Sequence, residues 1–257
     1  MIFIILSGVG AFNITMFSTY GENVTLPCKN VVYQNCSSTT WIYNNKTSGI
    51  IELVGHGKIK SENTERADRL SVGSDCSLNI HKVKARGAGL YTCRQFLHEG
   101  GDQTGVDYSV HLTVLKISSS LKQTEMRSGT TVTLYCSLHH KFTTCNDLVR
   151  TERLRLSWVN ETGADLQNTP TVKISHLSQC NISLTVELQD QDNQREWRCQ
   201  LTKGKEIQTS SITSNMCSTF ARYGQASKGL EQSILDILIL VLGLWHGSPE
   251  LYLGATK

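Results

Sequence analysis

The sequence lacks the features that mark several large classes of protein. It has only 3 prolines in 257 residues, too few for a rigid proline-rich stalk. Its formal net charge is +3 and its charged residues form no block of one sign, so we expect no nucleic-acid partner. It contains no glycine-rich phosphate loop, no serine-centred nucleophile elbow and no His-Glu-x-x-His helix. We therefore expect no catalytic residues, no enzyme activity and no cofactor.

Cysteine is abundant instead, with 9 residues in the chain. Such a content indicates metal or redox chemistry in a reducing compartment, and a disulfide framework in an oxidising one. Residues 1–12 (MIFIILSGVGAF) form an apolar run that ends in small residues, which is typical of a secretory signal peptide. The run is short and has no basic leader, and a buried first strand is the alternative. The working prediction is an extracellular protein, either held at the plasma membrane or secreted.

Glycosylation sequons point to the same compartment. Asn-x-Ser/Thr occurs at Asn13, Asn23, Asn45, Asn160 and Asn181, and a sixth copy at Asn35 includes Cys36. Six sequons are a mild excess over chance. We expect the first five to carry glycans.

An internal repeat is the strongest signal in the sequence. Cysteines and a tryptophan follow the order Cys, Cys, Trp, Cys, Cys in both halves, and the outer cysteines are 65 and 63 residues apart. The members are Cys28, Cys36, Trp41, Cys76 and Cys93 in the first half, and Cys136, Cys145, Trp158, Cys180 and Cys199 in the second. A fivefold pattern that occurs twice predicts a duplicated domain.

Strand-like alternation surrounds these residues. Apolar Val24, Leu26 and Cys28 alternate with other residues, and the second copy repeats this after Val132. A period of two with one apolar face indicates a sheet with one buried side, and many short strands between polar turns favour an antiparallel sandwich. The predicted fold class is all-β, with two sandwiches in tandem.

The repeat resembles the immunoglobulin superfamily over residues 13–214. In that fold a disulfide joins the two sheets beside a buried tryptophan, which implies Cys28–Cys93 around Trp41 and Cys136–Cys199 around Trp158. The family also has a tyrosine two residues before the second cysteine. Tyr91 stands there in the first copy, whereas Trp197 takes that place in the second. The acidic residue that usually opens this motif is replaced by Gly87, so we expect the usual salt bridge at the base of the first domain to be missing.

Two further cysteines remain in each domain. The resemblance leaves Cys36 with Cys76, and Cys145 with Cys180, and we expect each pair to bond within its own domain. Similar extra bridges recur in two-domain vertebrate leukocyte-type surface receptors, which the whole sequence resembles. A zinc site formed by Cys136, His139, His140 and Cys145 is the alternative, but the first domain has the same cysteines without the histidines. We expect no metal.

Spacing separates the two domains by type. The 52 residues from Trp41 to Cys93 leave room for the two extra edge strands of a variable-type domain, which residues 50–60 can supply. The 41 residues from Trp158 to Cys199 are too few, so the second domain is predicted to be constant-like. The expected domains are a variable-type domain over residues 13–116 and a constant-type domain over residues 117–214.

The candidate ligand-binding loop spans residues 96–105 (FLHEGGDQTG), between the last two strands of the first domain. Phe96 and Leu97 precede its polar tip and are candidate anchors for a protein ligand. A core-capping role for Phe96 is the alternative. The following strand lacks the Phe-Gly-x-Gly motif of rearranged antigen receptors, which favours a germline-fixed receptor.

The C-terminal region carries weaker signals. Residues 215–233 form a polar stalk, in which the odd Cys217 predicts an interchain disulfide and a covalent homodimer. A capped free thiol or an error in the gene model is the alternative. Residues 234–245 are apolar but fewer than the roughly 20 that a bilayer span needs. They form either a short membrane anchor or an apolar tail, and residues 246–257 form a short tail without a signalling motif.

These observations favour a cell-surface immune-type receptor or adhesion molecule. Its N-terminal domain would bind a protein ligand or counter-receptor, which can be a second copy of the chain. A secreted decoy or soluble ligand is the first alternative, and a structural or homophilic adhesion protein is the second.

Overall fold

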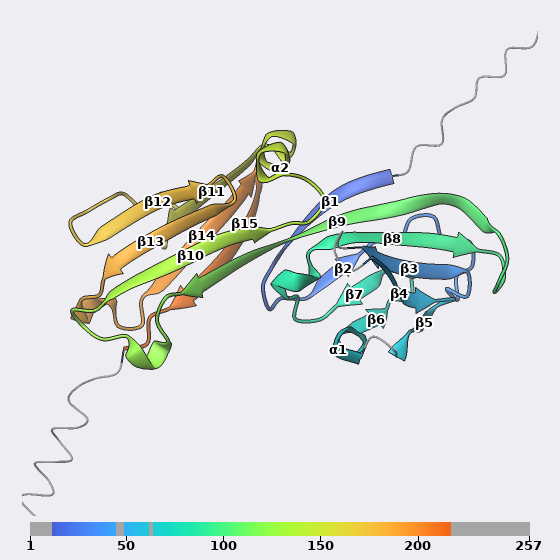
Figure 1. The fold of residues 1–257 in the computed structure, drawn as a ribbon, viewed down its shortest axis with the longest axis horizontal. Coiled ribbons are helices and arrows are strands. Elements are labelled where there is room, and N and C mark those ends of the chain that lie inside the picture. Colours follow the sequence, from blue (N-terminus) through green and yellow to red (C-terminus); the bar gives the residue numbers. More distant parts are fainter. Residues whose placement is uncertain (1–11, 45–48, 62–63, 217–257) are drawn as a thin grey trace, which may run out of the picture.

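The computed structural model describes residues 12–44, 49–61 and 64–216, which form two β-sandwiches placed end to end (Figure 1). Residues 1–11 of the expected signal peptide, Asn45, Cys217, most of the stalk and the whole of 234–257 lie outside the described residues. Phe12, the last residue of the expected signal, begins the first strand. Among the described residues, no helix is both long and apolar enough to span a bilayer.

The N-terminal domain consists of two facing sheets. One follows the order β9-β8-β3-β4-β5, with β1 parallel to β9 on its other side, and the second follows the order β2-β7-β6. Its elements are β1 (Phe12–Thr19), β2 (Val24–Leu26), β3 (Thr39–Asn44), β4 (Ile50–Gly55), β5 (Lys58–Ile59), α1 (Thr64–Ala67), β6 (Leu70–Val72), β7 (Leu78–Ile80), η2 (Ala85–Gly87), β8 (Gly89–Phe96) and β9 (Gln103–Ser119).

The two edge strands β4 and β5 lie in the segment where extra strands were expected. They extend the sheet of β8 and β3, as the two additional strands of a variable-type domain do. The N-terminal sandwich therefore has the variable-like arrangement.

The C-terminal domain has four strands facing three. One sheet is β12-β13-β10-β9 and the other is β11-β14-β15, which is the constant-like arrangement. Its elements are η3 (Gln123–Glu125), β10 (Thr131–His139), α2 (Cys145–Glu152), β11 (Leu154–Val159), β12 (Val172–Ser178), β13 (Asn181–Glu187), η4 (Asp190–Asp192), β14 (Glu196–Lys203) and β15 (Glu206–Thr213).

Each sandwich has its own core around a tryptophan and a disulfide. Trp41 and Cys93 are fully buried in the first, and Trp158 and Cys199 are at most 1% exposed in the second. The two buried apolar clusters share no residue. The chain therefore folds around two cores, as the repeat predicts.

The corner before the last cysteine differs between the domains. In the N-terminal domain the Tyr91 hydroxyl donates a hydrogen bond to the carbonyl oxygen of Gly87 at 2.7 Å, and burial raises the pKa of Tyr91. Gly87 offers no carboxylate that could pair with an arginine at this end of the domain. The Arg66 guanidinium lies 4.2 Å from the centre of the Tyr43 ring.

In the C-terminal domain Trp197 replaces this tyrosine. The Arg195 guanidinium stacks 4.3 Å from the centre of the Trp197 ring and also pairs with the buried Asp192 at 2.8 Å. The Ser214 hydroxyl donates to the carbonyl oxygen of Arg195 at 3.1 Å. An ion pair and a serine thus close the corner that a tyrosine closes in the N-terminal domain.

Strand β9 joins the two domains without a linker and runs through the expected boundary at residues 116 and 117 (Figure 1). Its first part pairs with β8 and its last part pairs with β10. Successive side chains on a strand point to opposite faces. Val114 therefore enters the N-terminal core while Leu115 enters the C-terminal one.

Side chains close the joint around this strand. Phe17 of β1 packs against the C-terminal core. The Glu152 carboxylate of α2 accepts a hydrogen bond from the Thr15 hydroxyl at 2.6 Å and pairs with Lys203 at 2.7 Å. These contacts fix how β1 sits against α2 and β14.

Candidate functional site

Three loops meet at the end of the N-terminal domain that lies away from the joint. They are residues 27–38 between β2 and β3, the turn at His56 and Gly57 between β4 and β5, and residues 97–102 between β8 and β9. The Phe96 amide donates to the Ser38 carbonyl oxygen at 2.7 Å, and the His56 ring lies 6.1 Å from the Phe96 ring. We call this surface the loop end.

The loop end exposes large apolar side chains. Leu97 is 53% exposed, and Val32 and Tyr33 are each 44% exposed. Phe96 is half-buried against His56 and lies outside the buried core. Of the two residues predicted from the sequence, Leu97 therefore has the exposure of an anchor and Phe96 supports the loop.

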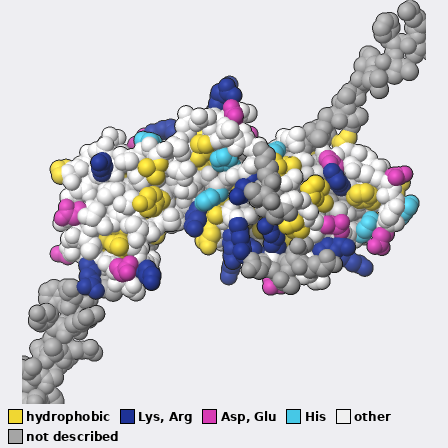
Figure 2. All heavy atoms as spheres, in the orientation of Figure 1, with side chains coloured by type: hydrophobic (Ala, Val, Ile, Leu, Met, Phe, Trp, Pro, Cys, Tyr) yellow, Lys and Arg dark blue, Asp and Glu magenta, His cyan; other side chains and the backbone are white. Residues whose placement is uncertain are grey.

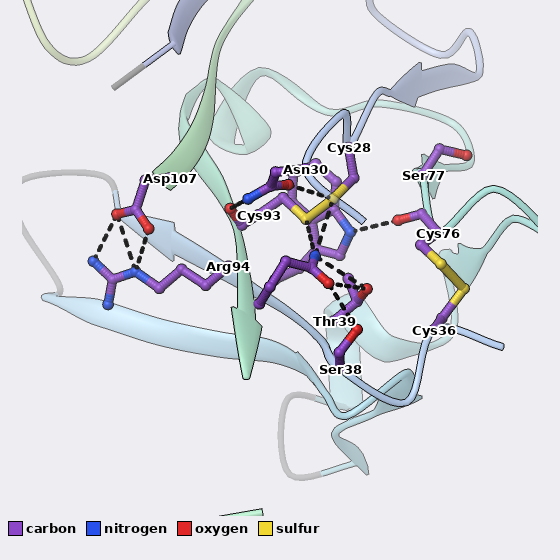
Figure 3. Close-up of a disulfide and its surroundings, with 12 residues drawn as sticks. Cys28, Asn30, Cys36, Ser38, Thr39, Cys76, Ser77, Cys93, Arg94 and Asp107 are labelled. Atoms are coloured by element: carbon purple, nitrogen blue, oxygen red, sulfur yellow. Dashed lines mark hydrogen bonds and ion pairs between the residues drawn. A yellow bond between two sulfur atoms is a disulfide. The ribbon is translucent and has the colours of Figure 1, made fainter. Parts of the chain in front are cut away.

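Gln95 holds two of these loops together from inside the domain. Its side chain is fully buried, and its amide oxygen accepts hydrogen bonds from the Ser38 hydroxyl at 2.8 Å and the Val32 amide at 3.3 Å. Its amide nitrogen donates to Thr39 Oγ1 at 3.2 Å and faces the Cys28–Cys93 disulfide (Figure 3). One buried amide thus joins the 27–38 loop to the root of the 97–102 loop.

The second disulfide of this domain fixes the same end. Cys36 in the 27–38 loop is bonded to Cys76 in the turn between β6 and β7 (Figure 3). The Trp41 indole donates to the Cys76 carbonyl oxygen at 3.0 Å. The bridge therefore couples the loop end to the tryptophan of the core.

The turn at Gly57 packs closely against Cys36 of this bridge. Gly57 has φ +77°, a left-handed conformation, and a Cβ atom there would lie 2.8 Å from the Cys36 carbonyl oxygen. Close by, the Ser77 hydroxyl and amide donate to Asp75 and lower the pKa of its carboxyl group.

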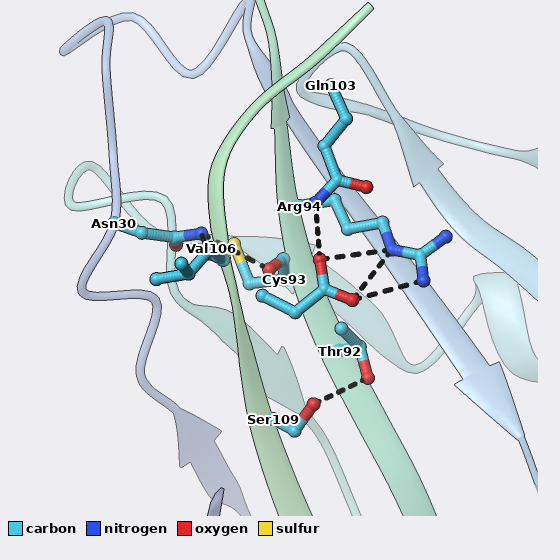
Figure 4. A network of polar contacts seen from close by, with 8 residues as sticks. Asn30, Thr92, Cys93, Arg94, Gln103, Val106 and Ser109 are labelled. Carbon is cyan, nitrogen blue, oxygen red and sulfur yellow. Dashed lines mark hydrogen bonds and ion pairs between the residues drawn. The ribbon is translucent and has the colours of Figure 1, made fainter. Parts of the chain in front are cut away.

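Polar contacts brace the strands below the 97–102 loop. The Arg94 guanidinium pairs with the Asp107 carboxylate at 3.0 Å, and Gln103 donates to the same carboxylate at 2.8 Å (Figure 4). Asn30 donates to the Val106 carbonyl oxygen at 2.6 Å, which ties the 27–38 loop to β9. The loop end is thus held in one shape before any partner arrives.

The structure pairs all eight cysteines of the repeat in the expected way, as Cys28–Cys93, Cys36–Cys76, Cys136–Cys199 and Cys145–Cys180. The zinc alternative is therefore not assembled, because its two cysteines lie in different disulfides. Ligand atoms of His140, Cys145 and Cys180 lie within 4.8 Å of one another. Both sulfur atoms are in a disulfide, however, and zinc binds thiolates.

The sequons occupy different parts of the surface. Asn13, Asn23 and Asn160 are exposed, and Asn181 at the start of β13 is half-buried. The Asn160 side-chain oxygen accepts hydrogen bonds from the amide and hydroxyl of Thr162 within its own sequon.

Sequence reasoning missed Val32, Tyr33 and Gln95. The first two belong to an apolar run, residues 31–33, that ends three residues before Cys36 in a loop between two predicted strands, which is a signal for a fixed and exposed loop. Gln95 lies two residues after Cys93, at a position that points inward in an alternating strand. Its role as a connector depends on the folded loops and has no local signal.

Comparisons with known proteins agree with this architecture. Residues 14–115 match the family model of the Immunoglobulin V-set domain. The N-terminal domain is an immunoglobulin-type domain. Among curated proteins, none matches the sequence.

Solved structures also match the chain. The crystal structure of murine CEACAM1b is 17% identical, with 78% of this chain and 96% of that chain covered and a TM-score of 0.28. At that score the likeness adds nothing to the assignment, which rests on the V-set match and on the two sandwiches. We use the names variable domain and constant domain for the two halves from here on.

Proposed function

We propose that this chain is a cell-surface receptor or adhesion molecule whose variable domain binds a protein ligand through the loop end. One observation carries the proposal: three loops are locked together and present Leu97, Val32 and Tyr33 to solvent. A few residues, among them tyrosines such as Tyr33, supply most of the energy of protein binding. A preformed surface adds to this because it loses little conformational entropy on binding.

The extracellular setting supports this proposal. Four disulfides are typical of proteins that fold in an oxidising compartment. Residues 234–245, which would hold the chain at the membrane, remain a prediction from the sequence.

The experiment compares two leucines that are similarly exposed in different domains. Fluorescent multimers of residues 12–216 are used to stain a panel of cells, first as wild type and then as Leu97→Asp or Leu177→Asp. Leu97 is 53% exposed in the loop end, and Leu177 is 62% exposed on β12 of the constant domain. We expect Leu97→Asp to weaken staining roughly tenfold or more, and Leu177→Asp to leave it unchanged.

Equal loss in the two variants, or loss only with Leu177→Asp, would contradict the proposal. The alternatives are separated by two further assays. Aggregation of beads that carry only this chain would show homophilic adhesion. Release of the full chain into the medium, without partition into detergent, would show a secreted protein.

A further inference from the structure

The extra disulfide of the constant domain is the most accessible of the four bridges. Of the eight bonded cysteines in the part of the chain that the structure describes, Cys145 is half-buried and the other seven are at most 8% exposed. Helix α2, which Cys145 begins, lies beside the waist between the domains (Figure 1), where Figure 2 shows histidine side chains at the surface. A reagent in solution can therefore reach this bridge through Cys145.

A histidine stands beside the same bridge. A ring nitrogen of His140 and the Sγ atoms of Cys145 and Cys180 lie within 4.8 Å of one another. The fold brings them together because the Leu138 amide donates to the Cys180 carbonyl oxygen at 2.8 Å, which holds the turn before β13 against the end of β10. No histidine of the described residues lies equally close to both sulfur atoms of the equivalent Cys36–Cys76 bridge. The two extra bridges therefore differ in chemistry as well as in exposure.

The start of α2 favours a thiolate at Cys145. Cys145 is the first residue of this 8-residue helix, and Thr144 is its N-cap. The free N–H groups and the dipole at a helix N-terminus stabilise a negative charge, and a cysteine placed there forms a thiolate readily. Asp147 in the first turn would oppose this charge, but its carboxylate is paired with Arg150 at 2.9 Å. The bridge thus combines an accessible sulfur, a nearby proton donor and a favourable place for the charge that appears when it opens.

We propose that the Cys145–Cys180 bridge is a site of thiol–disulfide exchange, at which an extracellular dithiol reduces it. In the first step a thiolate of the dithiol attacks Cys145 Sγ, the bond to Cys180 breaks, and the Cys180 sulfur leaves with the electron pair. Cys180 is only 1% exposed, and a charge is costly at a buried position. The ring of His140 lies close enough to pass a proton to this sulfur.

The second step releases Cys145. The other thiol of the dithiol attacks the dithiol's own sulfur in the mixed disulfide, and Cys145 leaves as the thiolate that the helix N-terminus stabilises. The dithiol is oxidised to a disulfide, and Cys145 and Cys180 are reduced. Of the two protons that the dithiol gives up, one reaches Cys180 through solvent and His140, and the other remains in solvent.

Reduction removes a constraint at the joint. Helix α2 ends at Glu152, whose carboxylate binds Thr15 and Lys203 across the joint. Opening of the bridge frees the first residue of this helix from the turn before β13, so we expect the contacts of its last residue to loosen. The variable domain keeps both of its own bridges. The exchange therefore acts on the way in which the domains are joined, and it rests on the proposed function only for its extracellular setting.

The test treats the folded full chain with dithiothreitol at neutral pH, blocks the free thiols with iodoacetamide, and follows each cysteine by peptide mass spectrometry. We expect Cys145 and Cys180 to be labelled roughly ten times faster or more than Cys36 and Cys76. His140→Gln should slow the labelling of this pair severalfold, whereas His139→Gln, the same change one residue away, should leave it unchanged. Leu97→Asp should react like wild type, which keeps this test independent of the loop end.

The sign of the change in His140→Gln separates a chemical role from a structural one. A loosened fold would speed reduction, so slower reduction with unchanged amide exchange in α2 supports the proposal. Equal labelling of the four bridges, earlier labelling of Cys36 and Cys76, or a wild-type rate in His140→Gln would overturn it. Labelling no faster than global unfolding would also overturn it. After selective reduction, faster amide exchange in α2 and β1 supports the effect on the joint, and unchanged exchange in β1 contradicts it.

Discussion

The two extra disulfides occupy the same place in their domains but serve different surroundings. Each links the segment before the tryptophan strand to the turn that precedes β7 or β13. In the variable domain the bridge lies at the exposed loop end. In the constant domain it faces the joint, because the domains follow one another head to tail along β9 (Figure 1).

The contacts around the two bridges follow from this difference. Cys36 shares its loop with the exposed Val32 and Tyr33. Cys145 begins helix α2, whose last residue, Glu152, binds Thr15 and Lys203 across the joint. A duplicated bridge thus fixes the exposed loop end in one copy and the domain interface in the other.

The residue two positions after the last cysteine shows a second divergence. In the variable domain it is Gln95, which connects the loops, and in the constant domain it is Leu201, which lies in the apolar core. The core tryptophans of the two domains also differ in their hydrogen bonding. Trp41 donates to Cys76, whereas the Trp158 indole nitrogen has no hydrogen-bond partner among the described residues.

Removal of each bridge is expected to have the largest effect. Cys36→Ala/Cys76→Ala and Cys145→Ala/Cys180→Ala should each lower the free energy of unfolding of their own domain by about 4 kcal/mol, since they open loops of 40 and 35 residues. Denaturant unfolding with a spectroscopic probe in each domain measures this loss. If the other domain lost as much stability as the mutated one, the conclusion that each bridge serves its own domain would be contradicted.

The next test exchanges the residues that stand two positions after the last cysteine of each domain. Gln95→Leu makes the variable domain resemble the constant one and leaves the Ser38 hydroxyl and Val32 amide without this partner. We expect a loss of about 2 kcal/mol in the free energy of unfolding, with faster amide exchange in the 27–38 loop. The reciprocal Leu201→Gln buries an unpartnered amide and should cost a similar amount in the constant domain. An unchanged 27–38 loop in Gln95→Leu would show that the amide does not connect the loops.

The ion pair at the joint should have a smaller effect. Glu152→Gln weakens the contacts to Thr15 and Lys203, and because the pair is partly exposed we expect a loss of about 1 kcal/mol or less. Small-angle X-ray scattering should show a wider spread of domain orientations. Glu99→Gln in the loop end is the control and should leave the scattering curve unchanged.

Acidification should destabilise the region around the joint, and this is the smallest of the expected effects. Burial lowers the pKa of His111, His139 and His140 below their usual value of 6.5; Lys116 and Lys141 lower that of His139 further, while Glu152 raises that of His111. The unfolded chain therefore binds protons more readily, so stability is lost as pH falls below about 6.5 and is restored as it rises. Urea unfolding at pH 7 and pH 5 should show a smaller decrease for His139→Gln/His140→Gln than for wild type. An equal decrease in both would contradict this assignment.

Glu152 should not contribute to that change. Burial tends to raise the pKa of its carboxyl group, but hydrogen bonds from Lys203 and Thr15 outweigh this and lower it. Its stabilising effect is complete above the usual pKa of 4.5 and is lost only as pH falls through the lowered value.

Much of the fold could be predicted because local patterns encode it. Apolar alternation marks the strands around Cys28 and Cys136, and the spacing after Trp41 anticipates β4 and β5. Even the joint has a signal. The alternation of Val110, Leu112 and Val114 changes phase at Leu115, where the strand begins to serve the second core.

Other features depend on the assembled chain and could not be predicted. Helix α2 has only 8 residues, too few for a clear helical period, although Thr144 caps it by accepting a hydrogen bond from the Asp147 amide. The connecting role of Gln95 likewise needs both loops in place.

The most direct test of the comparison is hydrogen–deuterium exchange measured on the two bridge variants side by side. We expect Cys36→Ala/Cys76→Ala to speed exchange in residues 27–38 and at Gly57, without change in α2 or β1. We expect Cys145→Ala/Cys180→Ala to speed exchange in α2 and in β1 across the joint, with the loop end unchanged. The same pattern in both variants, or no change in β1 when the Cys145–Cys180 bridge is removed, would contradict the account.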